Sequence, residues 1–201
     1  DPFLLHAGDA TGERARAVGY GLNATGAAGV DPQVNSPDLV RRAADNLIDA
    51  YGPAPVPSRR SNLAGPGKYV AGSANIYSAD FDSPAENANT LAHMGSLAEM
   101  IDFEGMIAPG DSGGPLLIRR AVGWMIAGVA SGLRSLSDPL SDYGDVGYWT
   151  GVNGAEAAAF LSGFEGVTYS DGTVRAVPLP AAGALLLAAL AAAAGLAARR
   201  S

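Results

Sequence analysis

One short segment of the chain combines a serine with the surroundings that nucleophilic catalysis requires. It reads Gly-Asp-Ser-Gly-Gly-Pro and runs from Gly110 to Pro115. A serine hydroxyl is a poor nucleophile until a base removes its proton, so Ser112 must project from a rigid, exposed turn. Glycines around it let the backbone bend tightly and let a substrate approach without a Cβ in the way. The pattern therefore predicts nucleophilic chemistry at Ser112.

The backbone of the same segment offers a second catalytic element. The N–H groups of Gly110 and Ser112 can point together at one spot, where they would hold the oxyanion of a tetrahedral intermediate. Loss of one such donor typically costs about 10²–10³ in rate. Two other interpretations stay open. The segment could be a chance Gly/Asp/Ser turn, or it could belong to a catalytically inactive relative that keeps its serine.

Composition narrows the chemistry further. The chain has 201 residues and a formal net charge of -7, which offers no basic footprint for nucleic acid and suits an exported protein. It contains no cysteine, so thiolate metal sites and cysteine-protease chemistry are excluded. Two histidines leave little material for a metal centre. We therefore expect neither a metal nor another cofactor, and no nucleic-acid partner.

The elements that must position Ser112 are short and separated by turns rich in Gly and Pro, which indicates an all-β barrel or sandwich. Residues 39–50 fit either a short amphipathic helix or a strand, because periodicity alone does not separate the two. A helix is expected at residues 155–161. Strands are expected at residues 13–21, 69–70, 75–77, 115–118, 122–130 and 146–152.

The motif and its flanking strands resemble the chymotrypsin-like (trypsin-family) serine proteases. Residues 19–21, Gly-Tyr-Gly, resemble the turn that opens the second barrel of that family. Residues 128–132 match the strand that lines the substrate cleft, and residues 147–152 match the strand that closes the specificity pocket. The resemblance covers about residues 13–163. It implies the second six-stranded barrel of the double-barrel fold, with the first barrel largely absent and a short C-terminal helix.

The resemblance also implies roles for the residues of the motif. Ser112 corresponds to the nucleophile, and Gly110 with Ser112 corresponds to the oxyanion hole. Asp111 corresponds to the aspartate that pairs with the new N-terminus after zymogen activation. The family orders its triad along the chain as His, Asp and Ser, with the first two on the first barrel. We therefore expect the base and its carboxylate to lie upstream of this chain.

The histidines of this chain do not fit the position of the base. His93 lies nineteen residues before Ser112, where a surface or packing role is expected. His6 lacks the Ala-Ala-His context of the family. Asp1, followed by Pro-Phe-Leu-Leu, faintly resembles the family's triad aspartate, although its spacing to Tyr20 is short. On this interpretation the chain alone does not hydrolyse peptides, whereas the full-length protein does.

The resemblance implies a substrate pocket with an apolar floor. Met106, six residues before Ser112, corresponds to that floor, although core packing explains it equally well. The absence of an acid there argues against a Lys/Arg preference and for a medium apolar side chain. Glu104 is a nearby acid that could instead be structural. The other pocket positions are Ser131, Gly132 and Leu133 on the cleft strand, and Gly147, which would leave the pocket open.

The C-terminal tail has a different character from the rest. Residues 176–198 carry no charge, and Arg199 and Arg200 follow them. As a helix this segment would span roughly 30 Å, enough to cross a bilayer with a cytoplasmic C-terminus. Val177, Pro178, Leu179, Pro180 and Ala181 resemble the VPLPA variety of PEP-CTERM sorting signal. That resemblance implies processing by an exosortase in a Gram-negative bacterium. An ordinary membrane anchor with a Pro-rich stalk, or a buried apolar helix, are the alternatives.

Three regions are therefore expected. Residues 1–168 form the C-terminal part of a serine protease domain, residues 169–176 a linker, and residues 177–201 the sorting signal with its transmembrane helix through residues 177–198. The expected function is an exported serine endopeptidase that acts on peptides or proteins. It would be held transiently in the inner membrane and then reach the cell surface or the exterior. The alternative is a non-catalytic surface or matrix binding module on the same scaffold.

Overall fold

The computed structural model describes residues 3–53, 74–136, 139–164 and 166–171. Most of its regular structure is strand, with one short α-helix, α1 (Ala155–Leu161), and one 3-10 turn, η1 (Ala92–Met94). The strands are β1 (Leu4–Leu5), β2 (Arg14–Gly19), β3 (Arg42–Leu47), β4 (Ala50–Gly52), β5 (Ile76–Asp80), β6 (Pro115–Arg120), β7 (Gly123–Arg134) and β8 (Val146–Gly151). The prediction of a mostly β protein with a helix at residues 155–161 is confirmed.

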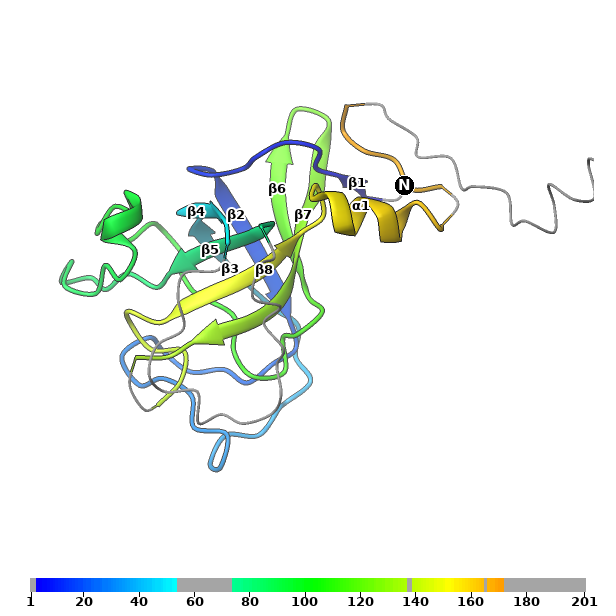
Figure 1. The fold of residues 1–201 in the computed structure, drawn as a ribbon. Coiled ribbons are helices and arrows are strands. Elements are labelled where there is room, and N and C mark those ends of the chain that lie inside the picture. The colour runs from blue at the N-terminus through cyan, green and yellow to red at the C-terminus, as the bar shows by residue number, and fades with distance from the viewer. Residues whose placement is uncertain (1–2, 54–73, 137–138, 165, 172–201) are drawn as a thin grey trace, which may run out of the picture.

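The strands form one sheet with the order β3-β2-β6-β7-β8-β5-β4, and neighbours in this order are antiparallel. β3 and β4 stand at the two ends of the order, yet they follow one another in the chain. Only Ile48 and Asp49 separate them, so the sheet must curl until its two ends approach. The result is a curled antiparallel half-barrel, in which the long strands β6, β7 and β8 bend around a common interior (Figure 1).

The interior is filled by side chains that alternate along the strands. Successive residues of a strand point to opposite faces, so a period of two separates core from surface. On β2, Ala15 is buried while its neighbours Arg14 and Arg16 reach the outer side. The main core cluster also contains Ile48, Tyr77, Ile107, Leu116, Ile118, Met125 and Trp149. This alternation is the reason the expected strand at residues 13–21 forms.

The ambiguity over residues 39–50 is resolved in favour of a strand. β3 pairs along its whole length with β2, from Arg42 opposite Gly19 to Leu47 opposite Arg14. Two arginines of β2, Arg14 and Arg16, bind the carboxylate of Asp45 on β3. These contacts lie between strands and could not be read from local periodicity. β7 also runs further than expected, to Arg134, with a register shift between Ala130 and Gly132.

The first residues that the structure describes belong to the sheet. β1 lies parallel to β7, and the His6 N–H donates to the Ile126 carbonyl at 2.8 Å. On its other side, Leu5 donates to Thr168 and accepts from Ser170. β1 therefore joins β7 to the residues that follow α1 (Figure 1).

The predicted sorting signal lies outside the described residues. Neither Val177 to Ala181 nor the uncharged span that follows them is described. Two other predictions also fall outside the described residues: the triad aspartate at Asp1 and the strand at residues 69–70. Within the ranges that the structure does describe, every helix is too short, or not apolar enough, to span a bilayer.

Candidate functional site: the Ser112 turn

The Ser112 turn, residues 108–115, leads directly into β6. The Asp111 N–H donates to the Ala108 carbonyl at 3.0 Å, and the Gly114 N–H donates to the Asp111 carbonyl at 2.9 Å. Gly110 has a φ of +99° and Gly113 one of +87°, both in the left-handed region where only glycine is unstrained. The glycines of the motif are therefore required by this backbone path.

The turn is also fixed to the neighbouring strand β7. The Gly113 N–H donates to the Ala130 carbonyl at 2.9 Å, and the Ala130 N–H donates to the Gly114 carbonyl at 2.8 Å. Ser112 itself is exposed. Within the described parts of the chain, the N–H groups of Gly110 and Ser112 enter no hydrogen bond. An exposed serine on a fixed turn, with two unused backbone donors beside it, is compatible with nucleophilic attack and oxyanion binding.

Asp111 joins the turn to the segment after β2. Its Oδ1 accepts the Gly21 N–H at 2.7 Å, and its Oδ2 accepts the Ala108 N–H at 2.9 Å. Gly19 and Gly21 pack directly on this carboxylate, and a Cβ at either position would overlap it. The Gly-Tyr-Gly segment is thus required by Asp111. Both carboxylate oxygens bind backbone N–H groups, whereas the resemblance implied a charged N-terminus as their partner.

Neither histidine is joined to Ser112 by any contact that the described residues show. His93 is exposed on η1. His6 is buried, only 6% exposed, and neither of its ring nitrogens has a hydrogen-bond partner among the described residues. Burial lowers the pKa of His6 below its usual value. Among the described residues, Ser112 lies beside two unused backbone N–H groups, and neither imidazole is in contact with it.

The predicted pocket residues fall into two groups. Met106 lines a cavity of about 380 Å³ that also borders Glu104, Asp111 and the segment of residues 17–26. Ser131, Gly132, Leu133 and Gly147 do not line this cavity. They lie on β7 and β8, where Gly147 pairs with Leu133 and the Ser131 hydroxyl donates to the Tyr148 carbonyl at 3.2 Å. Met106 therefore borders a different space from the other four residues.

Trp149 fills the space beside Gly147. A Cβ at Gly147 would lie 2.7 Å from Trp149 Cη2 and 3.5 Å from Ile107 Cγ1. The indole is buried, and it sits on β8 opposite Ala130, the residue that binds Gly113 and Gly114. From the absence of a side chain at Gly147 we expected an open pocket. Trp149 makes any pocket at this point narrower. The Gly-Tyr-Trp spacing, which puts residues 147 and 149 on one face of a strand, was the signal available in the sequence.

Sequence reasoning also missed a carboxyl cluster, formed by Asp49, Asp80, Asp82 and Glu104. Asp49 accepts the Asp80 N–H, and Asp80 accepts the Leu91 N–H at 2.7 Å and the Ser96 hydroxyl at 3.2 Å. Glu104 accepts the N–H groups of Asp82 and Ile101, both at 2.7 Å. Glu104 therefore bonds to two backbone N–H groups and also borders the cavity that Met106 lines. Through these bonds the cluster holds residues 81–105 against the sheet.

Three acids of this cluster, Asp49, Asp82 and Glu104, have raised pKa values. Burial, together with the neighbouring Asp80, raises the pKa of Asp49 to about 7. Burial and the charges of Asp80 and Glu104 raise the pKa of Asp82 to about 7, and burial raises that of Glu104. Asp82 Oδ1 is buried without a hydrogen-bond partner among the described residues. No three acidic or imidazole side chains of the described chain are arranged to hold a metal ion.

Comparison with known proteins assigns no family to the chain. No protein-family model matches it, and no curated protein matches it either.

Proposed function

We propose that the chain is the second-barrel part of an exported serine endopeptidase, with Ser112 as its nucleophile. The single observation that carries this proposal is the Ser112 turn itself. A six-residue Gly-Asp-Ser-Gly-Gly-Pro motif lies on an exposed turn that backbone hydrogen bonds fix to β7. The curled antiparallel sheet supports the proposal, since the resemblance implies a β-barrel in this part of the chain.

The proposed reaction proceeds in two halves. A base takes the Ser112 proton while Oγ attacks the carbonyl carbon of the scissile peptide bond. The carbonyl oxygen becomes an oxyanion and binds the N–H groups of Gly110 and Ser112. The carbon–nitrogen bond then breaks, the amine leaves with the proton, and an ester to Ser112 is left. Water, activated by the same base, hydrolyses this ester and regenerates Ser112.

The base and its orienting carboxylate would come from a part of the protein upstream of this chain. Two observations support this assignment. His93 and His6 have no contact with Ser112 among those described, and the imidazole of His6 is enclosed beside β7. The isolated chain would then be inactive.

Small apolar side chains are the proposed substrate preference next to the scissile bond. The resemblance assigns the pocket to the cleft side of β7 and β8, where Trp149 and Ile107 occupy the space beside Gly147. A buried indole cannot move aside without breaking the core cluster to which it belongs. The medium apolar side chain expected from sequence would therefore fit less well than alanine.

The tail would deliver this domain to the outside of the cell. The VPLPA segment, the uncharged span and the final arginines support membrane anchoring followed by exosortase processing. This part of the proposal rests on the sequence.

Peptide hydrolysis by the full-length protein tests the function. Wild-type protein, Ser112→Ala and Ser162→Ala would be incubated with a peptide library and the products identified by mass spectrometry. Ser162 is a matched control, because this half-buried residue lies at the end of α1 and, among the described residues, its hydroxyl bonds to the Ala159 carbonyl alone. We expect cleavage by wild type and Ser162→Ala alone, after small apolar residues. Folded full-length protein without activity would instead support the binding module.

A further inference from the structure

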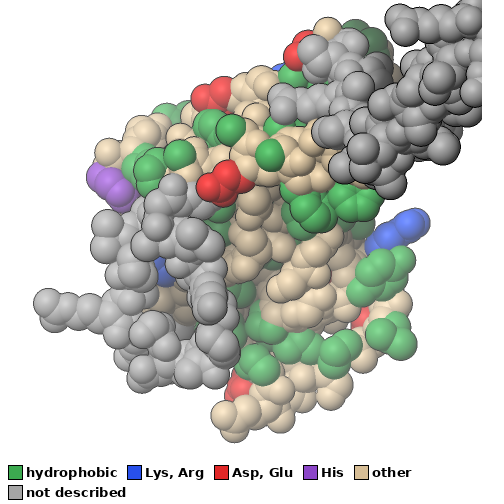
Figure 2. Space-filling model, turned by 45° about the vertical axis from the view of Figure 1, so that its right-hand side comes forward, with side chains coloured by type: hydrophobic (Ala, Val, Ile, Leu, Met, Phe, Trp, Pro, Cys, Tyr) green, Lys and Arg blue, Asp and Glu red, His purple; other side chains and the backbone are tan. Residues whose placement is uncertain are grey.

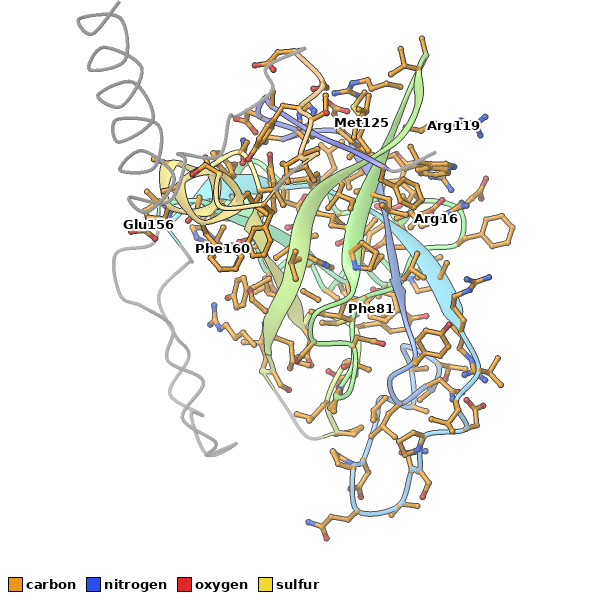
Figure 3. All side chains as sticks on the ribbon, turned by 90° about the vertical axis from the view of Figure 1, so that its right-hand side faces the viewer. Arg16, Phe81, Arg119, Met125, Glu156 and Phe160 are labelled. Atoms are coloured by element: carbon orange, nitrogen blue, oxygen red, sulfur yellow. The ribbon has the colours of Figure 1, made fainter. Side chains whose placement is uncertain are left out.

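A second site lies on the outer face of the sheet, where β2, β6 and β7 are neighbours. Trp124 on β7 pairs directly with Arg119 on β6, and Arg16 lies on β2, the next strand. The guanidinium carbon of Arg16 is 5.2 Å from the centroid of the Trp124 ring, and that of Arg119 is 5.6 Å from it. Figure 3 shows Arg16 and Arg119 on the same side of the sheet. Two cations are thus gathered on one indole.

The charges of this site do not balance. Arg14 and Arg16 share the single carboxylate of Asp45, and Arg120 pairs with Glu13. Arg119 has no carboxylate partner among the described residues. With the Glu13–Arg120 pair balanced, the three guanidinium groups of Arg14, Arg16 and Arg119 share the single carboxylate of Asp45, although the whole chain has a net charge of -7. On the face shown in Figure 2, by contrast, hydrophobic side chains are widespread and basic ones are few.

The arginines of this site border a surface cavity, and some of their N–H groups are not used in hydrogen bonds. A surface cavity of about 470 Å³ is bordered by Glu13, Arg14, Arg16, Asp45, Arg119 and Trp124. Arg16 uses Nε and Nη2 on Asp45, which leaves Nη1 unused there. The guanidinium of Arg119 makes no hydrogen bond among the described residues. Stacking on an aromatic ring fixes the plane of a guanidinium, so its donors lose less entropy on binding an anion.

We propose that this Arg–Trp site binds a doubly charged oxyanion, a phosphate or a sulfate, through Arg16 and Arg119. Two surplus positive charges match such a group better than a single carboxylate, and planar guanidinium donors match its oxygens. The anion relieves the repulsion between two cations held on one indole. The site is independent of the Ser112 turn, which stands at the opposite end of β6.

Of the two tryptophans in this chain, Trp124 borders the site and Trp149 is buried in the core, so a fluorescence change that is lost in Trp124→Phe reports binding at the site. Full-length protein would be titrated with inorganic phosphate and with sulfate against sodium chloride of equal ionic strength. The variants would be Arg119→Ala, Arg119→Lys and the control Arg41→Ala, which removes an exposed arginine outside the site. A sulfated oligosaccharide is titrated as well, so that the affinity for a sulfate group on a polymer can be compared with the affinity for the free ion.

We expect a saturable fluorescence change with phosphate or sulfate in the wild type and in Arg41→Ala. Arg119→Ala should bind about tenfold more weakly, because a charge-assisted hydrogen bond is lost. Arg119→Lys should fall between the two, since lysine keeps the charge and loses the planar donors. Tighter binding of the oligosaccharide than of free sulfate would assign the natural ligand to a polymer. An equal response to chloride, or unchanged affinity in both Arg119 variants, would overturn the proposal.

Discussion

The Ser112 turn and the carboxyl cluster hold their acidic groups in opposite ways. In the turn, Asp111 is matched by two backbone donors, one to each oxygen. In the cluster, buried carboxyl groups face one another, and Asp82 keeps an oxygen without a partner among the described residues. In the turn both oxygens of the Asp111 carboxyl group accept hydrogen bonds, whereas in the cluster burial raises the pKa of Asp49 and Asp82 to about 7. We therefore expect the backbone conformation of the Ser112 turn to stay the same at pH values that deprotonate Asp49 and Asp82 and destabilise the cluster.

The largest effect that separates the two regions should be the pH dependence of stability. Asp49 and Asp82 have a pKa of about 7 in the folded protein and of about 4 in the unfolded chain. The stabilisation from their protons is complete below about pH 4 and is lost as the pH rises through 7. The free energy of unfolding should fall by on the order of 3 kcal/mol between pH 5 and 8. Urea unfolding at several pH values measures it.

A variant carrying Asp49→Asn and Asp82→Asn should flatten this pH dependence, because neither amide titrates. Asp38→Asn is the control, since its exposed carboxyl pairs with Arg42 and its pKa is lowered, which moves its titration below the tested range. His6 acts in the opposite direction below pH 6.5, because burial lowers its pKa. A slope that persists in the double variant would contradict the assignment to this cluster.

A smaller effect is expected from Asp111→Asn in the turn. The amide keeps one acceptor oxygen and turns an NH₂ group toward a backbone N–H, so one of the two bonds to Gly21 and Ala108 is lost. The free energy of unfolding should fall by about 2 kcal/mol at every pH tested. Asp102→Asn, at an exposed position, should leave it unchanged. If Asp111→Asn lowered the free energy of unfolding only at high pH, the turn would depend on pH as the cluster does, which would contradict the comparison.

The two regions also differ in how far sequence reveals them. The Ser112 turn consists of consecutive residues, and its backbone conformation requires glycine at Gly110 and Gly113. The alternation of Arg14, Ala15 and Arg16 likewise predicts the strand that forms. Such features depend on neighbours in the chain, and they could be predicted.

The carboxyl cluster could not be predicted, because its members come from separate segments, and Asp49, Asp82 and Glu104 acquire their raised pKa only on burial. Residues 42–47 fit a helix as well as a strand until pairing with β2 decides between them. The hollow expected at Gly147 is filled by Trp149, since the two residues share one face of β8 and the indole turns inward. In each case a partner distant in sequence, or the direction of a side chain, decides the outcome.

The most direct test of the central claim is the position of a fluorophosphonate adduct on the full-length protein. Such a probe reacts with a serine that a base has activated and that has an oxyanion site beside it. Mass spectrometry of the labelled, digested protein should place a single adduct on Ser112, and Ser112→Ala should remain unlabelled. An adduct on a different serine, or unlabelled folded wild-type protein, would contradict the account.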